Sequence, residues 1–178
     1  MKSLYLIAPP CEGTMEGFPG ALTVLKNYLD HKLGENPSYI LDLEAESISQ
    51  VGKHISIPQD EEVVVGITAT TATYQNALQV ARAVKGINPN ATVVVGGHHV
   101  KYGTNQDQVV LEYHSDIVDY VCLGDGEKTI EALMQGKTGS EVPNVAFLSD
   151  GQVQHSQSGG LSTDEWEQVP FSIYEAKS

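Results

Sequence analysis

Cysteine is scarce in this sequence. The two that occur, Cys11 and Cys122, lie far apart and form no CxxC pair, so their spacing defines no disulfide framework. A reducing compartment is therefore the expected environment, and we expect a cytoplasmic location.

Long hydrophobic runs are also missing. No apolar stretch approaches the roughly 20 residues that a membrane-spanning helix needs. The N-terminal segment MKSLYLIAPP has a short apolar run that ends in two prolines, whereas a signal peptide needs a longer apolar region and a cleavage site of small residues. We therefore expect a soluble protein whose first residues form a β-strand.

Basic residues are few. Ten Lys and Arg against 23 Asp and Glu give a formal net charge of −13 at pH 7. Such a chain repels phosphate backbones and anionic lipid head groups at long range. We expect neither a nucleic-acid partner nor a membrane partner, although backbone N–H groups at helix starts can still bind an anion locally.

Several nucleotide-binding and catalytic motifs do not occur. There is no GxxxxGK[ST] phosphate loop and no GxSxG nucleophile elbow. Pro9-Pro10 follows the first apolar run in place of GxGxxG, and Thr68-Ala69-Thr70 stands where a response regulator has an aspartate. These absences argue against the corresponding nucleotide-binding, hydrolase and receiver domains.

The sequence does contain short apolar runs that alternate with helical segments. The β-rich runs span 4–8, 63–68, 92–95 and 117–123, with 39–43 as a weaker fifth candidate. Helical spacing marks 20–31, 74–85, 107–113 and 127–134, and 48–55 is ambiguous. Because continuous apolar runs are typical of parallel strands covered on both faces, we predict an α/β fold with a doubly wound sheet of five parallel strands.

The pattern changes after Gly136. Two short runs at 145–148 and 152–155 flank Ser149-Asp150-Gly151, which predicts a C-terminal β-hairpin over about residues 144–156. The segment that follows is polar and irregular. Since 178 residues suit one compact domain, we expect a single α/β domain over residues 1–157 and a linker or tail over 158–178.

Small and glycine-rich residues follow four of the predicted strands. These segments are 8–17, 68–73, 96–99 and 124–129. In an open α/β sheet, ligands bind outside the carboxyl ends of the strands, where the strand order reverses. A single glycine-rich loop is usually only a tight turn, but four of them at one edge favour a wide binding site lined by backbone.

The same loops resemble a known family. The runs VVVGITATTATYQNALQVARAVKGINPNATVVVGGHHV, DYVCLGDGEKTIEAL and VPNVAFLSDGQV, with the start LIAPP, are similar to the cobalamin-binding domain at the N-terminus of cobalamin-dependent radical S-adenosylmethionine enzymes. The resemblance covers nearly the whole chain. It implies a Rossmann-like (flavodoxin-like) sheet, with cobalamin across its carboxyl edge and the nucleotide tail buried in the sheet.

The resemblance also implies which residues contact the cofactor. Small hydroxyl residues after the third strand would line the tail, and the glycines after the fourth would let the backbone pass close to it. Gly124-Asp125-Gly126-Glu127 matches the family's Gly-Glu-Gly-Glu turn, with Asp125 in place of the usual glutamate. The complete set is Pro10, Glu12, Thr68, Thr70, Thr71, Thr73, Gly96, Gly97, His98, His99, Gly124, Asp125, Gly126 and Glu127.

No protein ligand to the cobalt is predicted. Methionine synthase and the mutases use a DxHxxG histidine, but the loop Pro9-Pro10-Cys11-Glu12-Gly13-Thr14-Met15 has none, so we expect no histidine lower ligand from it. The resemblance to the radical enzymes further implies base-off cobalamin. Cys11 and Met15 are conceivable soft neighbours of the metal. His98 and His99 are adjacent, so on an extended segment they point in opposite directions and do not readily share one metal.

The chain is not expected to be a complete enzyme. Radical S-adenosylmethionine enzymes hold their cluster through CxxxCxxC, which two cysteines cannot supply. The leading hypothesis is a cobalamin-binding module that serves a separate radical S-adenosylmethionine methyltransferase-type partner or a missing C-terminal domain, whose linker would begin in the last residues. The alternative is a degenerate member without cofactor that acts as a structural or protein-interaction domain.

Overall fold

The fold is built around one seven-stranded sheet with strand order β2-β1-β3-β4-β5-β6-β7. The computed structural model describes residues 2–11, 20–34 and 37–168. The strands are β1 (Ser3–Ala8), β2 (Ser38–Asp42), β3 (Val63–Thr68), β4 (Thr92–Gly96), β5 (Tyr120–Cys122), β6 (Val145–Ser149) and β7 (Gln152–His155). Within the described chain no helix is both long and apolar enough to pass through a lipid bilayer.

The first five strands are parallel, as predicted, but the sheet has seven strands and not five. β6 pairs antiparallel with β5, and β7 pairs antiparallel with β6. The predicted hairpin is therefore present, and it extends the main sheet. Asp150 and Gly151 both have positive φ, +51° and +74°, as a tight two-residue hairpin turn requires.

The order of the parallel strands creates a switch point between β1 and β3. The chain adds β2 on one side of β1 and then returns to place β3, β4 and β5 on the other side. This is the 2-1-3-4-5 order of flavodoxin-like sheets, in which ligands bind beyond the carboxyl ends of the strands at the point of reversal.

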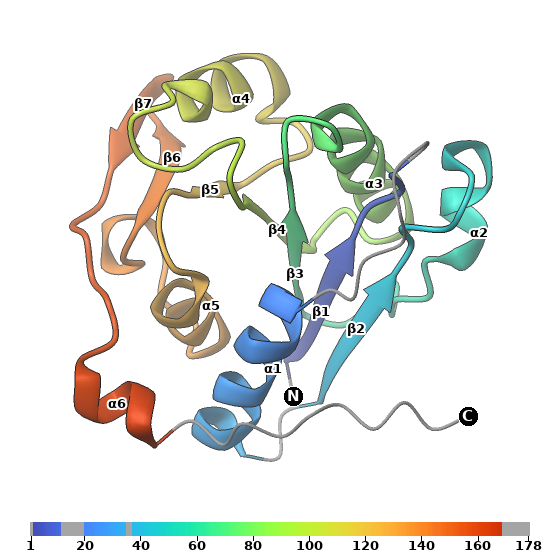
Figure 1. The fold of residues 1–178 in the computed structure, drawn as a ribbon. Helices are drawn as coiled ribbons and strands as arrows, with labels where there is room; N and C mark the ends of the chain where they lie inside the picture. The colour runs from blue at the N-terminus through green and yellow to red at the C-terminus, as the bar shows by residue number, and fades with distance from the viewer. Residues whose placement is uncertain (1, 12–19, 35–36, 169–178) are drawn as a thin grey trace.

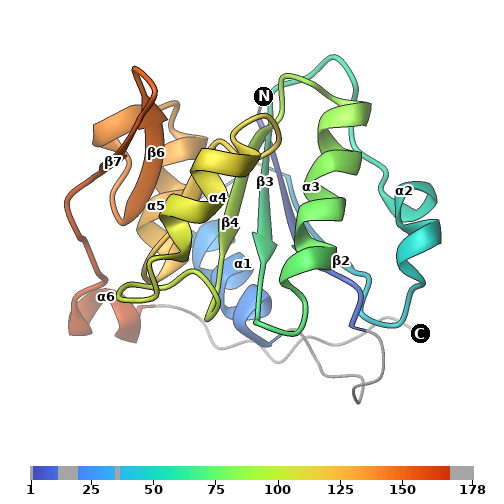
Figure 2. The ribbon, with the colours of Figure 1, turned by 90° about the horizontal axis from the view of Figure 1, so that it is seen from above.

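Helices cover both faces of the sheet (Figures 1 and 2). On one face lie α1 (Gly20–Leu33) and α5 (Gly126–Met134); on the other lie α2 (Val51–His54), α3 (Tyr74–Ile87) and α4 (Gln106–His114). Two short 3₁₀ helices cover Ile48–Gln50 and Gly139–Glu141. Only one turn of α-helix forms in the ambiguous segment 48–55.

The sheet has a separate apolar core on each face, because successive side chains of a strand point to opposite faces. Leu6 and Val94 pack toward α1 and α5, whereas Ile7, Ile67 and Val95 pack toward α3 and α4. The central parallel strands β1, β3 and β4 are thus buried on both faces, which explains their continuous apolar runs, whereas the edge strand β2 is partly exposed.

One local prediction differs from the structure. β5 is shorter than the predicted strand, because the amides of Ile117 and Val118 donate to the carbonyl of His114 and close the end of α4. Thr73 is the N-cap residue of α3, and its side chain makes no cap hydrogen bond to the helix. Its Oγ1 instead accepts from the amide of Thr70, at 3.0 Å.

The described part of the segment predicted as a linker contains a short helix, α6 (Thr163–Glu167). Ser162 and Glu165 form a capping box at its start, and Lys128 of α5 forms an ion pair with Glu165. Upstream, Asn144 both donates to and accepts from the backbone of Gly159. Residues 158–168 therefore contact the domain, and the boundary at residue 157 stays a prediction.

Candidate functional site

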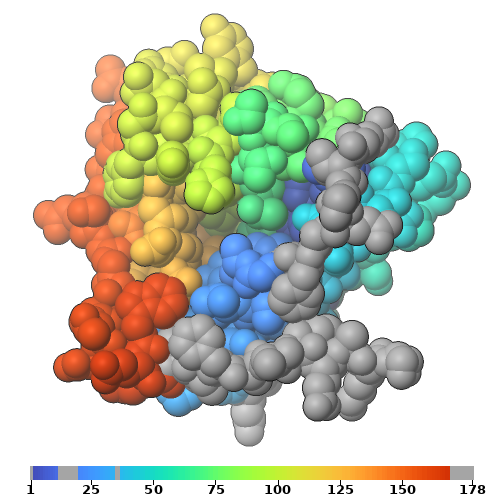
Figure 3. Space-filling model, viewed as in Figure 1, coloured from blue at the N-terminus to red at the C-terminus, as the bar shows by residue number. Residues whose placement is uncertain are grey.

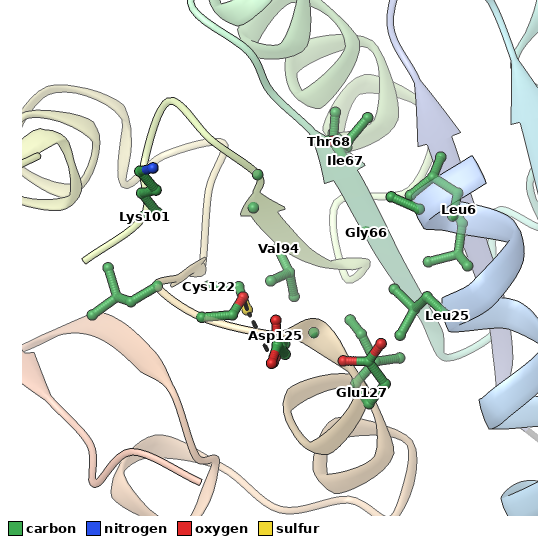
Figure 4. A pocket seen from close by; sticks show the side chains of 18 of the residues that line it. Leu6, Leu25, Gly66, Ile67, Thr68, Val94, Lys101, Cys122, Asp125 and Glu127 are labelled. Carbon is green, nitrogen blue, oxygen red and sulfur yellow. Dashed lines mark hydrogen bonds between the residues drawn. The ribbon is translucent and has the colours of Figure 1, made fainter. Parts of the chain in front are cut away.

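A pocket of about 500 Å³ opens at the carboxyl end of the sheet, on the face covered by α1 and α5. Figure 3 shows the surface hollowed between these helices and the segment after β4, and Figure 4 shows the pocket from close by. The lining residues are Leu6, Ala21, Leu22, Leu25, Gly66, Ile67, Thr68, Val94, Gly96, Gly97, His98, Lys101, Tyr102, Cys122, Leu123, Gly124, Asp125, Gly126, Glu127 and Ile130.

Gly66 gives the pocket its depth. It lies in the middle of β3, in register with Leu6 of β1 and Val94 of β4. A Cβ atom at this position would stand 3.0 Å from Leu6 Cδ2 and 3.7 Å from Ile130 Cδ1. At about 3.3 Å per residue, Gly66 lies roughly 7 Å inside the carboxyl end of its strand, so the missing side chain leaves space well below the rim.

Gly97 forms part of the rim by bringing two loops together. Its φ is +103°, and a Cβ atom would lie 2.7 Å from the carbonyl oxygen of Ala69. The amide of Ala69 donates to Gly96 O at 2.7 Å, and the amide of His99 donates to Ala69 O at 3.1 Å. Only glycine fits this close approach without strain, so the rim between β3 and β4 is made of backbone.

The lining changes from polar to apolar with depth. Lys101, Tyr102 and Asp125 lie at the exposed mouth. Leu6 and Val94 lie deeper on the sheet and are almost fully buried, and Leu25 of α1 and Ile130 of α5 also line the pocket. The pocket can therefore bury an apolar, ring-sized group and keep charged groups near water.

Glu127 is the exception within the buried part. Its side chain lines the pocket from the first turn of α5, it is 7% exposed, and its Oε2 has no hydrogen-bond partner. Burial raises the pKa of this carboxyl above its ordinary value, and the nearby charge of Asp125 adds to the shift. A buried polar atom without a partner is unfavourable, so a hydrogen-bond donor on a ligand would stabilise this side chain.

Cys122 contributes a buried thiol to the pocket wall. Its Sγ lies 3.4 Å from Thr129 Oγ1 and 3.4 Å from the carbonyl oxygen of Gly124. Burial raises the pKa of this thiol, so it stays protonated and behaves as a small apolar group. Among the residues that the structure describes, no three His, Cys, Asp or Glu side chains gather closely enough to bind a metal ion.

Eight of the residues singled out from the sequence come together around this pocket. They are Thr68, Gly96, Gly97, His98, Gly124, Asp125, Gly126 and Glu127. They come from the ends of β3, β4 and β5, which the strand order places side by side. Their contact with a cofactor stays a prediction.

The other predicted residues that the structure describes do not line this pocket. Pro10 accepts a hydrogen bond from Asn76 at 2.8 Å, and the hydroxyls of Thr70 and Thr73 pair at 3.1 Å in the turn before α3. Thr71 Oγ1 lies 3.4 Å from Nδ1 of His99, whose ring stacks on Tyr74. Glu12, like Met15, lies outside the described residues.

The apolar walls were not identified from the sequence. Leu6, Leu25, Val94 and Ile130 look like ordinary core positions, because nothing in their local pattern shows that a space adjoins them. One signal was present: Gly66 interrupts the apolar run VVVGIT, and a glycine inside a strand often marks a close approach of a ligand or another chain segment.

A second hollow, of about 640 Å³, lies away from the strand ends. It is bounded by residues 138–141 and the hairpin, and charged and amide side chains such as Glu141, Gln154 and His155 line it. It has neither the apolar wall nor the strand-end position of the first pocket, so the first is the candidate site.

The chain matches a known protein family and a curated protein. The model of the family described as B12 binding domain matches residues 19–134, well over half of the chain. An uncharacterized methyltransferase of Pyrococcus horikoshii, PH0819, is 26% identical over 185 aligned residues. That alignment covers 98% of this chain but only 39% of the relative, so the chain spans well under half of that protein's length.

Solved structures show the same fold. The cobalamin-dependent S-adenosylmethionine radical enzyme OxsB, with aqua-cobalamin and S-adenosylmethionine bound, matches with a TM-score of 0.70 and 15% identity over 89% of this chain and 22% of that one. The radical S-adenosylmethionine methyltransferase TsrM from Kitasatospora setae, with cobalamin and a [4Fe-4S] cluster bound, matches with a TM-score of 0.68 and 18% identity, over 92% of this chain and 30% of that one. The chain belongs to the B12-binding domain family, whose cofactor is cobalamin.

Proposed function

We propose that the pocket between α1 and α5 receives the nucleotide tail of cobalamin and that the corrin ring lies over the carboxyl ends of the strands. The observation that carries this proposal is the deep apolar part of the pocket beside Gly66. The pocket opens at the edge of the sheet where the strand order reverses. Flavodoxin-like sheets bind their ligands at this edge.

The residues that line the pocket suit cobalamin in size and polarity. A pocket of about 500 Å³ has the size of a small-molecule site, and its deep apolar wall complements an aromatic base. The backbone rim at Gly97 permits the close approach that a bulky macrocycle needs. Glu127 offers its unpartnered Oε2 to a hydroxyl or amide of the ligand.

When bound, cobalamin supplies a cobalt centre that can carry a methyl group. The chain's own contribution is to bind and orient. The walls formed by Leu6, Leu25 and Ile130 exclude water from the base, and the loops after β3, β4 and β5 hold the ring in one position. We propose that the base is held away from the cobalt and that no histidine of this chain replaces it.

We further propose that this module serves radical S-adenosylmethionine methyltransferase chemistry performed by other residues, either a partner or a further domain. Two observations support this. Its two cysteines cannot provide a CxxxCxxC cluster motif, and the chain covers only 22% and 30% of the matched radical enzymes and 39% of the matched methyltransferase.

The test is to mix the purified chain with hydroxocobalamin, desalt it, and record the visible spectrum. We expect a coloured protein with one corrinoid per chain. A colourless protein would contradict the proposal and favour the alternative of a structural or protein-interaction domain without cofactor.

The axial ligation has its own readout. After reduction to cob(II)alamin, we expect an electron paramagnetic resonance spectrum without nitrogen superhyperfine splitting, because neither the base nor a histidine would be bound to cobalt. Nitrogen splitting that disappears on substitution of His98 would show histidine ligation and contradict this part of the proposal.

A further inference from the structure

The charged side chains around the pocket are unequal in number. Asp125 and Glu127 are acidic, and Lys101 is the one lysine or arginine among the described lining residues. Among the lining residues that the structure describes, Lys101 is therefore the lysine or arginine side chain that an anionic ligand group can meet.

Lys101 lies where it can contact an anionic group of a ligand in the pocket. It lies in the segment between β4 and α4, is exposed at the pocket mouth, and stands across the pocket from Leu6 and Leu25 (Figure 4). Within the described part of the chain, no carboxylate forms an ion pair with it, whereas Lys2, Lys85 and Lys128 each form at least one ion pair.

The start of α5 does not offer an equivalent site. A helix N-terminus attracts anions through its free amides and its dipole. Here two carboxylates occupy that position: Asp125 is the N-cap residue, and the carboxyl of Glu127 accepts from its own backbone N–H. Their negative charge opposes a second anion at the same place.

We infer that Lys101 binds the phosphate of cobalamin's nucleotide tail and thereby selects complete cobalamin over corrinoids that lack the nucleotide. The inference rests on the proposed function. In the cofactor, the phosphodiester stands between the corrin ring and the base. If the base occupies the apolar depth beside Gly66, the phosphate falls near the polar mouth, where Lys101 lies.

The test pairs a deletion in the protein with a deletion in the ligand. Hydroxocobalamin and dicyanocobinamide, which lacks the phosphate and the base, are titrated into the wild type and into Lys101→Gln, Lys101→Arg and the control Lys137→Gln, which removes the same charge from an exposed position outside the pocket. Equal thermal unfolding of the variants checks that the fold is kept.

We expect Lys101→Gln to weaken hydroxocobalamin binding by roughly tenfold or more, as loss of a charge-assisted contact does. Cobinamide affinity should not change, Lys101→Arg should retain most of the affinity for hydroxocobalamin, and the wild type should lose more affinity for hydroxocobalamin with added salt than Lys101→Gln does.

Equal losses for both ligands, or no loss for either, would overturn the inference. In both cases the wild type would still bind cobalamin, and the proposed function would stand. A wild type that binds neither corrinoid would overturn the proposed function and the inference with it.

Discussion

At the scale of single residues, two glycines shape the pocket in different ways. Gly97 has a positive φ and would place a Cβ atom against backbone, so any side chain there strains the chain itself. Gly66 has ordinary strand geometry, and its hypothetical Cβ meets only the ends of the flexible Leu6 and Ile130 side chains. Gly66 is therefore the position at which the pocket can be filled while the fold is kept.

Replacing Gly66 with Val tests directly whether the nucleotide tail occupies the deep part of the pocket. β-branched residues suit a strand, so the fold should persist, while the added methyl groups occupy space that the nucleotide tail needs. We expect hydroxocobalamin affinity to fall by about 1.4 kcal/mol or more, about tenfold, when measured by visible titration.

The matched control for this variant is Gly86→Ala, on the exposed side of α3, where an added Cβ meets nothing within 4 Å. That variant should keep full affinity and gain about 0.5–1 kcal/mol of stability from the helix preference of alanine. If Gly66→Val binds hydroxocobalamin as well as Gly86→Ala does, the tail does not lie beside β3.

Glu127 links pH to the stability of the cofactor-free protein. The pKa of its carboxyl is raised above 4.5, so the folded state binds this proton more tightly than the unfolded state does. The carboxyl therefore becomes increasingly unfavourable to folding as the pH rises through 4.5 toward the folded-state pKa, and it stays so at neutral pH.

Glu127→Gln should remove that cost. We expect the variant without cofactor to melt a few degrees above the wild type at pH 7, with the difference shrinking as the pH approaches 4.5. The control Glu141→Gln removes an equal charge from an exposed position and should show no such trend. A difference that is constant with pH would contradict the assignment.

At the scale of elements, the success of sequence-based prediction depended on why a segment is apolar. Residues 63–68 form β3 as predicted, because continuous burial on both faces leaves a clear pattern. Ile117 and Val118 were assigned to a strand but belong to the turn after α4, because they are buried for packing and not for strand pairing. Local pattern cannot separate these two causes.

The sequence predicted the edge of the sheet that carries the site better than it predicted the walls of the pocket. The edge that carries the pocket followed from strand alternation and glycine-rich loops. The walls did not, because Leu25 and Ile130 face a space that forms only once α1 and α5 have packed on the sheet. Lys101 was missed for a similar reason, since a lysine in a polar loop is usually only a solvated side chain.

Helix α6 is held to α5 by a charge that is sensitive to acid. The ion pair with Lys128 and the amide of Ser162 lower the pKa of Glu165 to about 2. Because this pKa is depressed from 4.5, the contribution of Glu165 is complete above pH 4.5 and is lost as the pH falls toward 2.

Glu165→Gln should therefore loosen α6 at neutral pH. We expect faster amide hydrogen exchange in residues 163–167, while the sheet stays protected. Asp164→Asn is the matched control, since it removes a neighbouring exposed charge from the same helical turn. Equal exchange in the two variants would show that the ion pair does not hold α6 in place.

At the scale of the whole molecule, the elements that line the candidate site differ from those that only complete the sheet and its cover. The hairpin β6–β7 extends the sheet on the side away from the switch point, and α3 and α4 cover the opposite face. The candidate site uses only the carboxyl ends of the central strands, together with α1 and α5. The whole chain carries a formal net charge of −13 at pH 7, and Lys101 places a positive charge at the mouth of this site.

The most direct test of this arrangement is amide hydrogen exchange across the whole chain, with and without hydroxocobalamin. We predict slower exchange in the bound form at residues 66–68, 94–97 and 124–127, with no change in the hairpin or in α2. Protection centred on the hollow beside the hairpin, or no protection at the ends of β3, β4 and β5, would contradict the account.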